Sequence, residues 1–116
     1  TPLLQLHLNG GKCRDTQVLS PGSVDRLHRD RIGDVYGGDA SHPTRGYAMG
    51  WWVDRETGII DSNSAYGSVP WLDLDDDYGV FAAVEADWSA PRALKALLEE
   101  PIDDAITAAN AQLIDE

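Results

Sequence analysis

Residues 46–87 read GYAMGWWVDRETGIIDSNSAYGSVPWLDLDDDYGVFAAVEAD, and this stretch decides the fold. It contains every Trp except Trp88, together with the single Met and the single Phe. Its apolar runs are separated by turns rich in Gly and Asp, a pattern typical of strands joined by hairpins. We therefore expect an antiparallel sheet here, with the flanking segments packed against it.

Alternation and turn residues divide this stretch into strands. Aromatic and apolar residues alternate over 47–53, which predicts one strand with a strongly aromatic face. The sequence DRETG at 54–58 predicts a hairpin turn that leads into a return strand at Ile59 and Ile60. A third strand is expected over 69–74. Within the run 80–86, the positions from Val80 to Val84 are apolar in succession, which predicts a central strand covered on both faces.

The segments on either side have helical patterns. Residues 2–8 are Leu-rich and precede Asn-Gly-Gly, and Ser20-Pro21 is a typical helix start. The range 33–45 lacks apolar periodicity and predicts a surface loop. After Ser89-Ala90-Pro91 we expect one helix that ends near Pro101 and a second helix beyond it, because an internal proline clashes with the preceding turn.

These elements predict an α+β fold. We expect an antiparallel meander of three or more strands, flanked by short N-terminal helices and by a C-terminal helix packed on the sheet. The 116 residues suffice for one domain or a fragment of one. Its three parts are helices and loop at 1–45, strands at 46–87 and C-terminal helices at 88–116.

Composition excludes several classes of partner. The chain has 20 acidic and 9 basic residues and a formal charge of -11, which argues against nucleic acid and anionic membrane surfaces. No apolar run is long enough for a membrane span and no leader pattern opens the chain, so we expect a soluble protein. Of the possible locations, the cytoplasm is favoured. Thr1 in place of Met suggests an excised, processed or truncated piece.

No cofactor or metal site is predicted. His7, His28 and His42 are far apart in the sequence and accompany one cysteine, so we interpret them as solvated side chains rather than zinc ligands. Cys13, on a Gly-rich turn, is interpreted as an exposed thiol without a catalytic role. Asp73, Asp75, Asp76 and Asp77 suggest a calcium loop, but the Gly and the expected Glu are misplaced, which favours a solvated hairpin turn.

Four segments together resemble a known family. They are LHLNGGK at 6–12, VLSPGSV at 18–24, GYAMGWWVD at 46–54 and AYGSVPWLDLDDDYGVFAAVEAD at 65–87. In this order and spacing they resemble the C-terminal part of the serine β-lactamase-like family, which includes penicillin-binding proteins, class C β-lactamases and related carboxylesterases. The resemblance spans nearly the whole chain. It implies the last helices before a sheet, three antiparallel strands and a closing helix.

The family's chemistry requires three elements, and the resemblance implies that this chain holds one of them. Neither a Ser-x-x-Lys nucleophile motif nor a Tyr-x-Asn element occurs in the sequence. The third element, Lys-Thr-Gly or His-x-Gly, aligns with Ser62-Asn63-Ser64. Ser62 then replaces a cationic or imidazole side chain, and Ser64 places a β-carbon where glycine lets substrate approach.

The candidate site residues are therefore Ser62, Asn63, Ser64 and Tyr66, as a substrate-cleft wall without a catalytic residue. The alternative is a polar strand end on an ordinary sheet edge. We expect the chain to be the C-terminal segment of a serine hydrolase that cleaves esters or amides, inactive alone because the nucleophile lies on another segment.

Two further hypotheses remain open. The chain could be a stand-alone binding or oligomerising module that retains the fold without catalysis. Hydrolysis by the chain itself, through Ser62, Ser64 or a histidine such as His42, is a weaker possibility, since nothing in the sequence places a base beside a serine. The expected partner is either the missing N-terminal half of the hydrolase or another copy of the chain, because the piece alone would leave an apolar strand edge unpaired.

Overall fold

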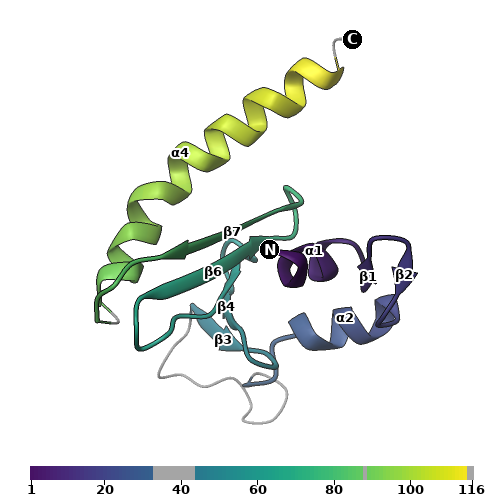
Figure 1. The fold of residues 1–116 in the computed structure, drawn as a ribbon, viewed down its shortest axis with the longest axis horizontal. Coiled ribbons are helices and arrows are strands. Elements are labelled where there is room, and N and C mark those ends of the chain that lie inside the picture. Colours follow the sequence, from purple (N-terminus) through teal and green to yellow (C-terminus); the bar gives the residue numbers. More distant parts are fainter. Residues whose placement is uncertain (33–43, 88, 115–116) are drawn as a thin grey trace. The chain divides into compact units, whose positions relative to one another are not determined.

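The computed structural model describes residues 1–32, 44–87 and 89–114 (Figure 1). In chain order the elements are α1 (Pro2–Leu8), β1 (Lys12–Cys13), β2 (Thr16–Gln17), α2 (Pro21–His28), β3 (Arg45–Tyr47), β4 (Trp52–Asp54), β5 (Ile60–Asp61), β6 (Ser68–Asp73), β7 (Tyr78–Ala83) and α4 (Ser89–Ile114). The predicted α+β class is confirmed. The chain forms two compact units, residues 1–62 with 70–81 and residues 63–69 with 82–116, so the expectation of one domain or fragment stays a prediction.

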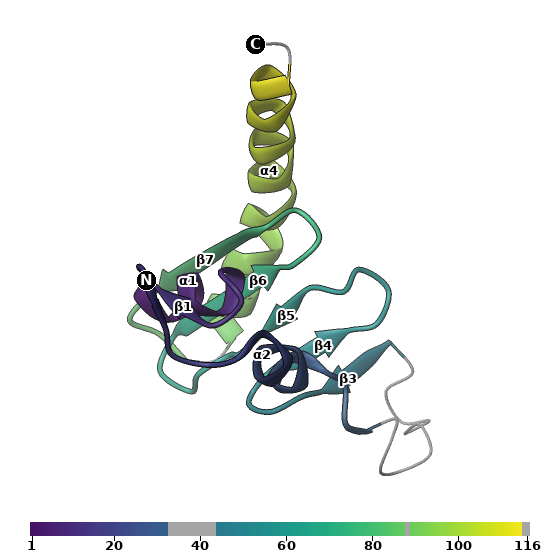
Figure 2. The same ribbon diagram turned by 90° about the vertical axis from the view of Figure 1, so that its right-hand side faces the viewer.

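The larger sheet has five strands in the order β3-β4-β5-β6-β7, so sequence neighbours are also sheet neighbours (Figure 2). This order confirms the predicted meander. β1 and β2 form a separate two-stranded hairpin in which Lys12 is opposite Gln17. The turn at 54–58 is also confirmed: the Asp54 N–H donates to the Ile59 carbonyl, and Gly58 has a φ of 76°.

The core of the first unit is centred on Ile60, which is 1% exposed. The strand register places Ile60 opposite Val53 on β4 and opposite Leu72 on β6. Side chains from α1 and from the turn before β4 complete this buried cluster, namely Leu4, Ala48 and Trp51. Burial of such side chains stabilises the folded state by about 1.5–3 kcal/mol each.

The single strand expected over 47–53 was wrong. These residues form the end of β3, a turn and the start of β4, and the two strands pair with Tyr47 opposite Trp52. Gly50, with a φ of 87°, allows the turn, and the Ala48 N–H donates to the Trp51 carbonyl across it. Consequently Tyr47 and Met49 are exposed while Trp51 is buried, which differs from the predicted aromatic face.

The central position expected for the strand over 80–86 was also wrong. β7 is the terminal strand of the sheet among the described residues, and its burial alternates from the buried Tyr78 to Phe81, which is 51% exposed. Of the three exposed positions of β7, Gly79 and Ala83 are small, and Phe81 is the large apolar side chain among them. Alanine and glycine leave little apolar area in water, so the sequence run alone overstated the burial.

The starts of the helices agree with the sequence. The Ser20 side chain caps α2 by accepting the Ser23 N–H, and Thr1 caps α1 in the same way through the Leu4 N–H. At the start of α4, the Asp87 carboxylate accepts from the hydroxyl and from the N–H of Ser89, and these two hydrogen bonds, the hydroxyl's first, lower the Asp87 pKa.

The break expected at Pro101 was wrong, because α4 continues through this residue as one helix of 26 residues. Proline removes one backbone donor, which leaves the Leu97 carbonyl without its usual partner. The sequence before Pro101 is rich in Ala, Leu and Glu, and the sequence after it is rich in Ala. Because these residues favour helix, an uninterrupted helix loses less free energy than one that ends and starts again. The predicted loop at 33–45 lies outside the described residues except for its last two positions.

Gly67 allows a close backbone approach in the second unit. Its φ is 99°, and a β-carbon there would lie 1.8 Å from the Val84 carbonyl oxygen. The Val84 N–H donates to the Gly67 carbonyl at 2.8 Å, so the two segments cannot separate without losing this bond. Gly50 has a similar φ of 87° but open space around it.

We expect Gly67→Ala to lower the free energy of unfolding by at least about 3 kcal/mol, since it combines a left-handed conformation with a clash. Gly50→Ala is the matched control, because it carries the conformational strain without the clash, and should cost about 1–2 kcal/mol. Urea unfolding followed by circular dichroism measures both. Equal losses in the two variants would contradict the close approach.

Candidate functional site

Ser62, the first residue of the aligned third motif, follows directly after β5. Its N–H donates to the Pro70 carbonyl at 3.1 Å, which continues the pairing of β5 with β6 for one more residue. Its side chain is half-buried, and within the described residues its hydroxyl has no hydrogen-bond partner. Ser62 thus lies at a strand end, as the sequence predicted, with a hydroxyl that is not used by the fold.

Ser64 has a different environment, because its hydroxyl organises the turn of residues 64–68. Its Oγ accepts the N–H groups of Tyr66 and Ser68, both at 3.2 Å, and its own N–H donates to the Ser68 carbonyl at 2.9 Å. Tyr66, at the tip of this turn, is 90% exposed. A hydroxyl that already accepts two backbone hydrogen bonds is a turn-forming group first. Within the described ranges the Ser64 hydroxyl is hydrogen-bonded to backbone N–H groups and not to an imidazole or an amine.

Asn63 lies between these two serines, and its side chain is half-buried. Its Oδ1 atom is removed from solvent and has no hydrogen-bond partner among the described residues. A buried amide oxygen without a partner costs about 1–3 kcal/mol, and a water, an ion or another group bound there would remove this cost. Of the sequence-predicted site residues, Asn63 is the one whose environment is incomplete.

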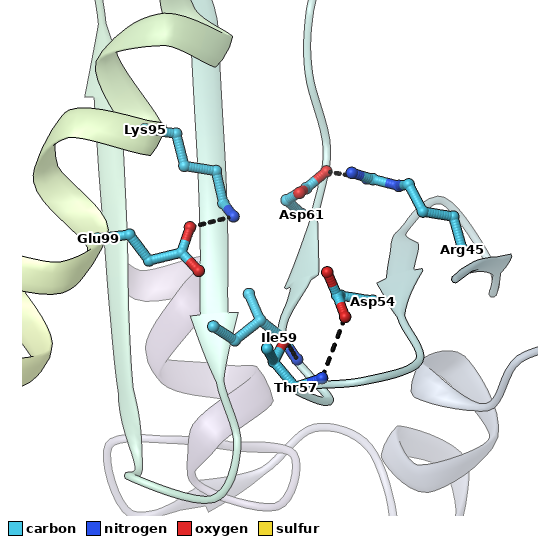
Figure 3. A network of polar contacts seen from close by, with 7 residues as sticks. All are labelled: Arg45, Asp54, Thr57, Ile59, Asp61, Lys95 and Glu99. Atoms are coloured by element: carbon cyan, nitrogen blue, oxygen red, sulfur yellow. Dashed lines mark hydrogen bonds and ion pairs between the residues drawn. The ribbon is translucent and has the colours of Figure 1, made fainter. Parts of the chain in front are cut away.

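A partly buried ion pair involves Asp61, the β5 residue directly before Ser62. Asp61 is 4% exposed, and the register places it between Trp52 on β4 and Trp71 on β6. Arg45 donates to its Oδ1 at 3.0 Å (Figure 3). The Arg45 guanidinium also lies 5.7 Å from the ring centre of Trp52. The guanidinium compensates the carboxylate that the sheet buries. The sequence reasoning missed this pair, although an Asp beside two Ile residues was a possible signal.

Asp30 joins three segments of the first unit. Its Oδ2 accepts from Arg55 at 2.8 Å, and its Oδ1 accepts the N–H groups of Ile32 and Tyr47. Burial acts to raise the Asp30 pKa, but these hydrogen bonds and the Arg55 charge outweigh burial and lower it. The Arg31 N–H also donates to the Tyr47 carbonyl at 2.8 Å, so residues 30–32 cover the outer edge of β3.

The two acidic turns are closed by their own side chains. Asp73, which is 7% exposed, accepts the N–H groups of Asp75 and Asp76 at 3.0 Å each, which confirms the predicted hairpin turn. Asp54 accepts from Thr57 in the same manner (Figure 3), and this bond helps to lower the Asp54 pKa against the opposing effect of burial. Among the residues that the structure covers, no group of three or more potential ligands is arranged for a metal ion.

The interpretation of His7 and His28 as solvated side chains was wrong. His7 is 8% exposed, and its Nδ1 lies 2.7 Å from Nε2 of His28 on the facing helix. The His7 ring also meets the Trp51 ring edge-on at 5.2 Å between centres. Burial lowers the pKa of both histidines, and for His28 the His7 charge adds to this while the Asp25 charge opposes it. His42 lies outside the described residues.

Two smaller predictions can also be compared with the structure. Cys13 is an exposed free thiol, as the sequence suggested. None of the helices in the described ranges combines the length and the apolar character that crossing a lipid bilayer requires.

Comparisons with known proteins support the fold. Over 90% of its length this chain superimposes on part of a crystal structure of a putative beta-lactamase from Bacteroides dorei DSM 17855, with a TM-score of 0.58 and 21% sequence identity. The chain has a β-lactamase-like fold. It spans 38% of the length of the Bacteroides protein. No family model and no curated protein matches the sequence.

Replacement of Ser64 and of Ser62 tests whether the Ser64 hydroxyl stabilises the fold and the Ser62 hydroxyl does not. Ser64→Ala removes the acceptor of two backbone N–H groups, so we expect it to lower the free energy of unfolding by about 1–2 kcal/mol. Ser62→Ala is the matched control and should change stability by less than about 0.5 kcal/mol. Thermal unfolding of both variants measures the difference, and a larger loss for Ser62→Ala would refute these assignments.

Proposed function

We propose that this chain is the C-terminal segment of a β-lactamase-like serine hydrolase, and that the complete protein cleaves esters or amides. The observation that carries this proposal is the β-lactamase-like fold of the chain, which spans 38% of the Bacteroides protein. A segment of this kind supplies the sheet, one wall of the substrate cleft and the closing helix. The nucleophile and its base belong to another segment, since the sequence has no Ser-x-x-Lys.

In this proposal Asn63 and Ser62 contact substrate, or a residue of the other segment, and Ser64 holds the turn. The free hydroxyl of Ser62 and the unpartnered Oδ1 of Asn63 are the two polar groups available for this task. Tyr66, exposed at the tip of the turn, is available as a flat apolar surface at the edge of the cleft. The Ser62 hydroxyl can donate and accept a hydrogen bond but carries no charge, so it orients substrate without electrostatic assistance.

A fluorophosphonate probe and p-nitrophenyl butyrate test the proposal. The 116-residue chain alone should neither hydrolyse the ester nor react with the probe, whereas a protein extended by an N-terminal half with Ser-x-x-Lys should do both. In the extended protein, Asn63→Ala should lower kcat/KM by about tenfold or more, and the probe should label the N-terminal half. Labelling of Ser62 or Ser64 in the chain alone would overturn the proposal, and S62A and S64A identify which serine reacted.

A second candidate function is that of an oligomerising module without catalysis. The open edge of β7 favours it, because Tyr78–Ala83 contains neither a charged residue nor proline. Such residues commonly protect an edge strand from pairing. Residues 30–32 cover the β3 edge, whereas no described strand lies beyond β7. The partner of β7 is either a strand of the other segment or β7 of a second copy.

Light scattering of the chain alone distinguishes these partners. We expect self-association at micromolar concentration, and Phe81→Lys should weaken it at least about tenfold, since like charges would face each other across paired edges. Val18→Lys is the control, because Val18 is a similarly exposed apolar residue outside β7. A monomeric wild-type chain would contradict the module hypothesis and leave the hydrolase segment as the proposed function.

A further inference from the structure

The two histidines of the first unit form a contact that neither the fold comparison nor the proposed function explains. His7 is in the last turn of α1 and His28 ends α2, and their rings face each other with centres 4.9 Å apart. At 2.7 Å between Nδ1 of His7 and Nε2 of His28, one ring must donate its N–H and the other must accept. The contact therefore requires that at least one ring is neutral.

The same contact lies over the core of the unit. His7 meets the edge of Trp51, and three residues earlier in α1 Leu4 belongs to the buried cluster around Ile60. α2 is joined to the turn before β4 separately, since the Met49 N–H donates to the Leu27 carbonyl at 3.2 Å. Loss of the histidine contact would thus leave α1 held over the core by Leu4 without its bond to α2, while α2 kept its own bond to the turn.

We propose that the His7–His28 contact is an acid-sensitive latch that holds α1 over the core of the sheet. When both rings carry a second proton, two N–H groups and two positive charges face each other where one hydrogen bond was. Neither ring can then accept, and the charges repel in a site that is partly shielded from water. α1 detaches, and the apolar side chain of Leu4 and the sheet surface beneath it become accessible.

The charged groups around His7 and His28 do not prevent α1 from detaching when both rings are protonated. In α1, His7 is the one titratable side chain, and the turn of residues 48–51 has no charged residue. On α2, Asp25 is close enough to favour the protonated form of His28, which works against opening. The pKa of both rings is nevertheless lowered, because burial disfavours their charged forms.

The direction of the pH dependence follows from these shifts. The released rings have the ordinary histidine pKa near 6.5, and the rings in the closed latch have lower values. The open state therefore binds more protons. The stability of the closed state is complete above pH 6.5 and is lost as pH falls from there towards the lowered values. Each proton taken up on opening changes the closed-to-open ratio by about tenfold per pH unit in this window.

Hydrogen exchange of the backbone N–H groups of α1 tests the latch directly. After correction for the intrinsic exchange rate, protection of Gln5 to Leu8 should fall by about tenfold or more between pH 7 and pH 5, while protection within α4 stays constant as the internal control. The double variant H7Q/H28Q keeps a hydrogen-bonding pair that does not titrate, so its α1 protection should not depend on pH. A pH dependence retained in this variant would overturn the proposal.

Asp25→Asn supplies a second test with a definite sign. Removal of the carboxylate lowers the pKa of His28 in the closed state further, so α1 should open at a higher pH than in the wild type. If the double variant fails to fold, NMR titration of the His7 and His28 rings in the wild type tests the latch. Two coupled ring titrations below 6.5 support the latch, and two independent titrations at the ordinary value contradict it.

Discussion

The structure of the first unit depends on the register that places Ile60 opposite Val53 and Leu72. Because strand side chains alternate, this register fixes both faces of the sheet at once. One face receives the apolar cluster with Leu4. The other face receives Asp61 between two tryptophans, and this buried carboxylate requires the Arg45 guanidinium. A shift by one residue would bury the charge in the apolar cluster, so the ion pair also protects the register.

The sheet has two edge strands, β3 and β7, and the residues found at each edge link the fold to the proposed function. Asp30 binds the Tyr47 N–H and Arg55 together, so the β3 edge is closed within the chain itself. β7 is the last strand of the sheet within the described ranges. The β7 edge is the place where a second copy could pair.

The sequence predicted those features that depend on neighbouring residues. The 54–58 turn, β6 and the Ser20 and Ser89 helix starts follow from local Asp, Gly, Ser and Pro chemistry. It did not predict contacts between residues distant in the chain, such as His7 with His28, 21 positions apart, or Asp30 with Arg55, 25 positions apart. The hairpin around Gly50 was missed because aromatic residues on both sides imitate one alternating strand. For the site, the strand end at Ser62 was predictable, whereas the role of Ser64 depends on how the 64–68 turn closes.

The tryptophans differ in burial, so their intrinsic fluorescence reports on the folded state of the chain. Trp71 is 0% exposed and Trp52 is 40% exposed, yet both are opposite Asp61, because β4 and β6 flank β5 on its two sides. A water-soluble quencher such as iodide reaches an indole that faces water and is kept from one enclosed by the sheet. Emission that stays resistant to iodide therefore reports that the surroundings of Trp51 and Trp71 remain folded, and it does so without any attached dye.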